Sequence, residues 1–229
     1  MINKKIFFLL MIFLSLLNSQ EKELKPVHAN QNLIIDSDNS SLRWLGGLKY
    51  NVNDHYGFIK IKNGKINLNE DKKITGRIVV DMKSITNEDV ESKWKQNLVN
   101  HLKSPDFFDV QKYSESFIQI NSSKIIRKLE NENYLVQIDA ELTIKSIVNR
   151  IRFEAIIDFD STTKNATGKM VFDRNDFEIQ YRSEMHIYDP DSFWNKLEST
   201  RATAMDKVIK DEIEIIFDIK TKEEFLHLN

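Results

Sequence analysis

The chain has 229 residues, a formal net charge of −2 from 33 basic and 35 acidic side chains, and no cysteine. Nucleic acid is not an expected partner, because the charges are interspersed and form no concentrated basic face. The lack of cysteine excludes thiolate chemistry, disulfides and a lipid-modified N-terminal cysteine, so the fold must rely on its core.

The first twenty residues are typical of a secretory signal peptide. Lys4 and Lys5 precede an apolar run at residues 6–14, which is too short to span a bilayer. We predict a signal peptide over residues 1–20, a flexible polar leader over 21–31, one domain over 32–221 and a tail over 222–229. Cleavage would place the protein in the periplasm or outside the cell; an uncleaved membrane anchor is the alternative.

Most of the remaining sequence alternates between apolar and polar residues, which is the pattern of half-buried β-strands. The predicted strands are residues 33–36, 41–45, 56–68, 75–82, 116–124, 134–144, 150–160, 168–174, 177–187 and 209–219. Turn signals lie at residues 62–65, 130–133 and 160–163. The pattern predicts an all-β domain of antiparallel strands around one core, either an up-and-down barrel or a sandwich.

Residues 88–103 interrupt this alternation with a helical pattern. The apolar residues that lie four apart are Val90, Trp94, Leu98 and Leu102. This stripe predicts an amphipathic helix. Thr86 and Asp89 resemble a capping box at its start, with Asn87 as a competing cap, and Pro105 predicts its end.

No catalytic or metal-binding constellation is recognisable. None of the five histidines forms a close pair at metal-ligand spacing, and neither a glycine-rich phosphate loop nor a nucleophile elbow is present. Asp106 and Asp109 could be read as a carboxylate pair. After Ser104 and Pro105, however, they are better explained as acidic residues favoured at the start of a short helical turn. We therefore expect no metal site, no catalytic site and no enzyme activity.

A short block carries a resemblance to a known family. Residues 101–110 read His-Leu-Lys-Ser-Pro-Asp-Phe-Phe-Asp-Val and resemble the signature of the YceI-like, lipocalin-related family. Further matches, in the expected order, are Asp36 with Ser40 and Ser41, Ile85-Thr86-Asn87, Lys112-Tyr113, residues 139–144, Asn149-Arg150, Arg174-Asn175-Asp176-Phe177 and residues 209–215. The resemblance thus covers about residues 33–220. Ala140, Ser146 and Glu178 depart from it, because the family usually has glycine there.

This resemblance implies an antiparallel, lipocalin-like up-and-down β-barrel of about eight strands with one or two short helices packed at one end. Family members are exported proteins that hold an isoprenoid chain, such as a polyprenyl lipid or quinone tail, and are not established as enzymes. The implied function is transport or storage of such an apolar isoprenoid lipid. No cofactor is expected apart from a bound lipid or quinone, and transient contact with a membrane would supply the lipid.

The candidate lipid-binding residues lie in the helical segment, the signature block and the strands. They are Trp94, Leu98, Leu102, Phe107 and Phe108 at the mouth, with Phe153, Ile157 and Phe172 along the wall. For each phenylalanine, packing in an ordinary core is the alternative. His101 is either a contact for a polar head group or a helix-terminal histidine that the helix dipole favours.

An alternative function is a ligand-free envelope module that recognises another protein or the cell surface. Residues 191–207 predict a second helix, and its Phe193 and Trp194 could form such a contact. The sequence leaves the oligomeric state open, a dimer included.

Overall fold

The computed structural model describes residues 30–51, 54–185 and 207–223. The predicted signal peptide and most of the predicted leader lie outside these ranges, as does the helix predicted at residues 191–207 except for Lys207. The last strand runs through Lys222 and Glu223, the first two residues of the predicted tail.

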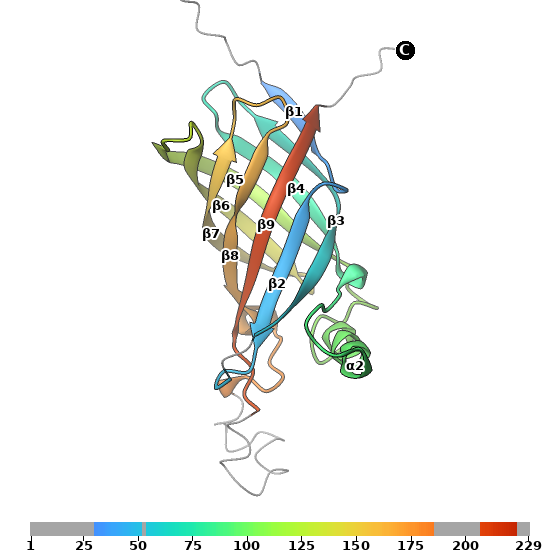
Figure 1. Cartoon of the computed structure of the whole chain (residues 1–229). Coiled ribbons are helices and arrows are strands. Elements are labelled where there is room, and N and C mark those ends of the chain that lie inside the picture. The colour runs from blue at the N-terminus through green and yellow to red at the C-terminus, as the bar shows by residue number, and fades with distance from the viewer. Residues whose placement is uncertain (1–29, 52–53, 186–206, 224–229) are drawn as a thin grey trace, which may run out of the picture.

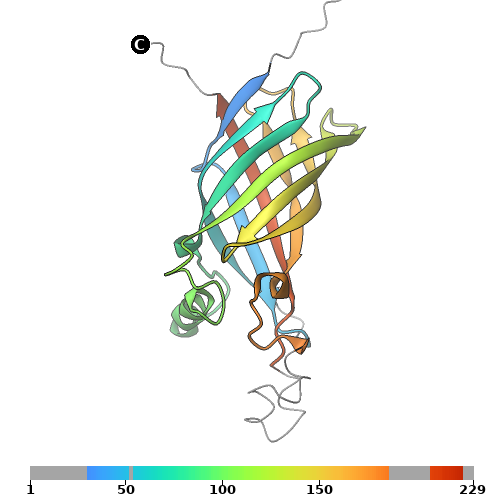
Figure 2. The same ribbon diagram turned by 180° about the vertical axis from the view of Figure 1, so that it is seen from behind.

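Nine antiparallel strands in the described part of the chain form one closed barrel (Figures 1 and 2). They are β1 (Gln31–Ile35), β2 (Ser41–Gly47), β3 (Asp54–Leu68), β4 (Ile74–Asp81), β5 (Glu115–Lys128), β6 (Tyr134–Ile144), β7 (Ile147–Asp158), β8 (Asn165–Asp173) and β9 (Glu212–Glu223). The order β1-β3-β2-β9-β8-β7-β6-β5-β4 closes through the β3–β4 and β1–β9 pairings. Because β1 and β2 both pair with β3 and β9, they share one place in an eight-strand wall. The lipocalin-like barrel is therefore confirmed, and the sandwich is excluded.

The two ends of the barrel differ. α2 (Ser92–Lys103) and the 3-10 helices η1 (Met82–Ser84) and η2 (Arg174–Phe177) lie at one end, which we call the helix end (Figure 1). β1 begins and β9 ends at the opposite end, which we call the terminal end (Figure 2). Among the described residues, no helix has the length and apolarity that a bilayer span requires.

Alternation of side chains explains why the core lies inside the wall. In β6 the inward residues are buried and the outward residues lie nearer the surface, so the predicted bounds and face of this strand are both confirmed. β7 begins three residues earlier than predicted and β9 begins three residues later, although the inward face of each is as predicted. Period-two patterning fixes the face of a strand better than its ends.

Two local predictions are wrong. Residues 62–65 form no turn, because β3 continues through them with a bulge between Ile61 and Asn63 and pairs there with β4. A Cβ on Gly64 would lie 2.6 Å from Ile35 Cδ1, so glycine serves close packing here. Residues 177–187 form no strand within the described part: Phe177 ends η2, and Glu178 turns the chain in the left-handed conformation with φ of 56°.

The predicted helix start is also wrong, because α2 begins at Ser92 rather than at residue 88. Residues 84–89 instead run beside the first half of β3, in the position that β4 leaves empty. Side-chain oxygens of this segment accept alternate backbone N–H groups of β3, namely Ser84 from Lys60 at 2.7 Å, Thr86 from Phe58 at 3.1 Å and Asp89 from Tyr56 at 2.9 Å. The supposed capping residues therefore satisfy an otherwise unpaired strand edge.

Asp89→Asn is expected to weaken this attachment by about 1 kcal/mol at neutral pH. Burial raises the pKa of Asp89, but hydrogen bonds from His55, the Tyr56 N–H and Asn87 outweigh it, so the pKa lies below its ordinary value. The carboxylate thus stabilises the fold above the ordinary pKa of 3.8, and that stability is lost as the pH falls through the lowered value. In urea unfolding, the difference in unfolding free energy between wild type and Asp89→Asn should shrink as the pH is lowered. A difference that does not depend on pH would contradict the prediction.

Two of the three residues that stand where the family usually has glycine, Ser146 and Glu178, adopt the left-handed conformation that favours glycine. Lys145 and Ser146 form the two-residue turn between β6 and β7 with φ of 51° and 64°, and Glu178 keeps a positive φ after η2. Left-handed backbone favours glycine but admits other residues at a modest energetic cost. Ala140 lies within β6 and fits as a small inward residue.

Candidate functional site

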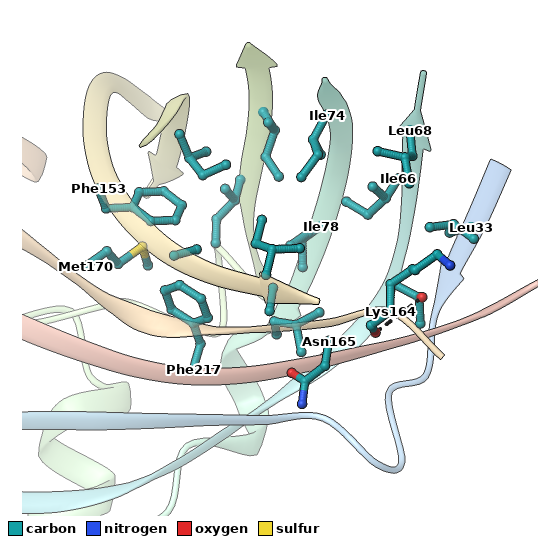
Figure 3. A pocket seen from close by; sticks show the side chains of 18 of the residues that line it. Leu33, Ile66, Leu68, Ile74, Ile78, Phe153, Lys164, Asn165, Met170 and Phe217 are labelled. Atoms are coloured by element: carbon teal, nitrogen blue, oxygen red, sulfur yellow. Dashed lines mark hydrogen bonds between the residues drawn. The ribbon is translucent and has the colours of Figure 1, made fainter. Parts of the chain in front are cut away.

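The barrel encloses two adjoining apolar cavities. The terminal-end cavity has a volume of about 100 Å³ and the helix-end cavity about 300 Å³. Both are lined by the same four side chains where they meet: Leu42, Ile118, Met170 and Ile215. Figure 3 shows the terminal-end cavity, with Met170 and Phe153 reaching in from one side and Ile74 and Ile78 from another. Together the cavities form an apolar path along the barrel.

Seven of the predicted lipid-binding residues line these cavities. Leu98, Leu102, Phe107, Phe108 and Phe172 lie around the helix-end cavity, and Phe153 and Ile157 line the terminal-end cavity. The Phe153 and Phe217 rings pack edge to face with centroids 5.6 Å apart. The path is therefore built from both strand walls and the signature block.

Trp94 and His101 lie away from the cavity walls. The Trp94 side chain is 56% exposed on α2. The His101 ring stands edge-on to Phe107 and Tyr181, with centroids 5.0 and 4.6 Å away, and its Nε2 lies 3.5 Å from Asp106 Oδ2. His101 thus lies at the end of α2 and contacts the Phe107 ring, and Phe107 is the one of the two that lines the cavity.

The signature block is a compact turn rather than the short helical turn predicted. α2 ends at Lys103, just before Ser104 and Pro105, as predicted. The backbone carbonyl of Ser104 accepts from the N–H groups of Phe107 at 3.1 Å and Asp109 at 2.9 Å. Val110 and Phe107 are buried beneath this turn, so it seats a phenylalanine against the helix-end cavity.

Arg174 is a buried charge beside the same cavity. Its side chain is fully buried, and all five N–H donors of its guanidinium are used. The acceptors are the backbone carbonyls of Ile179, Tyr181, Ile209 and Lys210, at 2.7 to 3.3 Å, and Asp211 Oδ1 at 3.1 Å. Burial lowers the pKa of Arg174, whereas Asp211 and Asp173 raise it. Arg174 therefore joins the segment after η2 to the segment before β9.

Polar groups are scarce on both walls. The helix-end cavity meets His55, Ser116 and Arg174, and the terminal-end cavity meets Lys164, Asn165 and Thr221. His55 is already engaged, since its Nδ1 lies 2.8 Å from Asp89 Oδ2. Within the described ranges, no cluster of three or more histidine, aspartate or glutamate side chains could hold a metal ion. The arrangement suits an uncharged, mostly hydrocarbon molecule.

Sequence reasoning missed the roles of Ser116 and Arg174. Ser116 lies on the inward face of β5 together with Ile118 and Ile120. A lone polar residue on an apolar face was a usable signal. Arg174 likewise falls on the face of Met170 and Phe172 in the predicted strand 168–174, but the sequence could not identify its partners, which lie up to 37 positions away. Only the folded chain brings those carbonyls together.

Two solved structures have the same fold as this chain. Burkholderia cenocepacia BcnA superposes with a TM-score of 0.55 at 14% identity, covering 81% of this chain and 98% of that one. A polyisoprenoid binding domain from Saccharophagus degradans, implicated in plant cell wall breakdown, has a TM-score of 0.55 at 13% identity, covering 85% and 99%. At such identities the likeness shows the fold alone.

Sequence comparison establishes the family. No curated protein sequence is significantly similar to the chain. The family model of the YceI-like domain matches residues 34–221, which include every strand from β2 to β8, most of β9 and the end of β1. The chain therefore belongs to the family of YceI-like domain proteins.

Proposed function

We propose that this protein carries an isoprenoid-type lipid inside its barrel, for transport or storage. The observation that carries the proposal is the apolar path formed by the two adjoining cavities. Each Å² of apolar surface removed from water contributes about 25 cal/mol, so a long hydrocarbon chain gains most from such a path. The similar fold of a polyisoprenoid binding domain from Saccharophagus degradans supports the same ligand class.

The rest of the proposal concerns how the ligand reaches the barrel. We propose that the protein is exported and takes its lipid from a membrane, through the helix end. Leu98, Leu102 and Phe108 line the cavity there, and each is only half-buried. Half-buried apolar side chains at a rim fit the passage of a chain between two apolar phases.

The proposal is tested on the purified full-length chain. Organic extraction followed by mass spectrometry should recover an isoprenoid lipid, and added polyprenols should raise the melting temperature. Recovery of no lipid, together with no thermal shift for any polyprenol, would refute the carrier function. Co-purification of a protein instead would favour the envelope-module alternative.

Ala155→Phe should shorten the chain that the barrel accepts. Ala155 is buried on β7 and lines the terminal-end cavity, so a phenylalanine there would fill the smaller cavity and leave the larger one open. We expect affinity for the long polyprenol solanesol to fall about tenfold or more, while farnesol, which needs only the helix-end cavity, loses little. Fluorescence titration would measure both, because Trp44 lines the helix-end cavity.

The neighbouring Ile156→Phe provides the matched control, because Ile156 points out of the same strand and is exposed. It should change neither affinity. If Ala155→Phe changes the affinities for solanesol and farnesol equally, the ligand chain does not extend into the terminal-end cavity. Melting temperatures must be compared as well, since overpacking alone costs about 1–3 kcal/mol.

A further inference from the structure

A single hydroxyl interrupts the buried apolar wall of the helix-end cavity. Ser116 points inward from β5 and is only 5% exposed. Its Oγ has no hydrogen-bond partner among the described residues. A buried polar group without a partner is rare in folded proteins and usually has a functional explanation. Ser116 also lines the cavity itself, so its hydroxyl is placed to meet a ligand.

The other polar groups of this cavity are already occupied or lie at its rim. All five donors of Arg174 are used by four carbonyls and Asp211, which leaves none for a ligand. His55 is paired with Asp89, and its side chain is 45% exposed, where water competes for any hydrogen bond. Among the described residues, the Ser116 hydroxyl is therefore the one buried side-chain group on this wall that is still free to hydrogen-bond a ligand.

We propose that Ser116 binds a neutral oxygen group, a hydroxyl or carbonyl, on an isoprenoid-type ligand in the helix-end cavity. This inference rests on the carrier function proposed above. A serine hydroxyl both donates and accepts, so it matches an alcohol or a quinone-type carbonyl. A phosphate inside this cavity would be a desolvated charge without an available cation, which is strongly unfavourable. The ligand class is thus a neutral oxygen-bearing isoprenoid, with its tail directed towards the terminal end.

The test compares three probes that share one chain: geranylgeraniol, the same hydrocarbon without the hydroxyl, and geranylgeranyl phosphate. With the full-length protein, Ser116→Ala should weaken geranylgeraniol binding about fivefold to tenfold and leave hydrocarbon binding unchanged. The phosphate should bind wild type no more tightly than the alcohol does. Ser122→Ala, an exposed serine on the same strand, is the matched control and should alter none of the three affinities.

Stability supplies a second readout. Removing a hydroxyl that has no partner should leave the melting temperature of the ligand-free protein unchanged or slightly raised, whereas a structural hydroxyl would lower it. Hydrocarbon binding by wild type reports on the carrier function, and the difference between alcohol and hydrocarbon reports on Ser116. If all three probes bind but Ser116→Ala leaves every affinity unchanged, including the difference between the alcohol and the hydrocarbon, the Ser116 site is refuted. The carrier function is then unaffected. If no probe binds, the carrier function fails first; tighter binding of the phosphate would overturn the neutral ligand class.

Discussion

Arg174→Met is expected to lower the free energy of unfolding by about 4 kcal/mol, enough to unfold a marginal domain at physiological temperature. Methionine retains much of the apolar stem but removes five hydrogen bonds at once. Four backbone carbonyls would then lose a charged donor, and so would the Asp211 carboxylate, whose side chain is 24% exposed. Each buried acceptor left without its donor costs about 1–3 kcal/mol, so the carbonyls account for most of the loss.

Two further variants separate the causes of this loss. Arg174→Lys keeps the charge but cannot reproduce the planar fork, so it should recover only part of the stability. Arg152→Met removes an arginine that is 68% exposed and paired with Asp139, and it should cost less than about 1 kcal/mol. Urea titrations of the three variants measure these differences. Similar costs for Arg174→Met and Arg152→Met would mean that the buried guanidinium does not hold the helix end together.

Gly57→Ala is expected to destabilise the fold by about 3 kcal/mol and to displace the segment that leads into α2. A Cβ on Gly57 would lie 2.0 Å from the Thr86 carbonyl oxygen and 2.8 Å from Asn87 Cα. Both neighbours are backbone atoms, which cannot move aside as a side chain does. The Thr86 carbonyl also accepts a hydrogen bond from Trp44 Nε1 at 2.8 Å, so the strain should reach a side chain that lines the helix-end cavity.

Gly46→Ala is the matched control on the neighbouring strand. Its Cβ would lie 3.1 Å from Ile213 Cδ1, the end of a flexible side chain, so the cost should stay within about 1 kcal/mol. Urea unfolding gives the two stabilities, and tryptophan fluorescence reports on the Trp44 environment. Equal stabilities for the two variants would show that residues 84–89 can shift away from β3 without loss.

The close approach at Gly57 also explains why one sequence prediction was wrong. Thr86, Asn87 and Asp89 have the residue types of a helix cap, and nothing nearby in the sequence argues against that role. In the fold they meet the backbone of β3, some 30 positions earlier. Thr86 and Asp89 accept its N–H groups, and the Asn87 side-chain amide donates to the Tyr56 carbonyl. Capping a helix and pairing with β3 both satisfy backbone groups that would otherwise be unpaired, and tertiary contact decides between them.

A similar competition occurs within β3 and after β8. Asn63 and Gly64 carry a strong local turn signal, yet both pair with β4, and the chain stays extended into the residues from Lys65 onward that also pair with β1. Residues 177–187 carry alternating apolar residues, yet Arg174 binds the carbonyls of Ile179 and Tyr181, which a strand would have offered to a neighbour. Strand pairing overrode a local turn signal in the first case, and hydrogen bonds from a nearby arginine side chain replaced strand pairing in the second.

The sequence by itself determined the all-β class, the inward face of each long strand, the stop of α2 before Pro105 and the family. These properties are local: period-two burial, the missing N–H of proline and a contiguous ten-residue block. Only the tertiary structure decided that β1 and β2 share one position in the closed barrel. It also decided that all five Arg174 donors are used at the helix end and that the Ser116 hydroxyl faces an apolar cavity. Those outcomes depend on which distant groups are desolvated together, and hydrogen-bond partners and cavities exist only once the strands have closed around them.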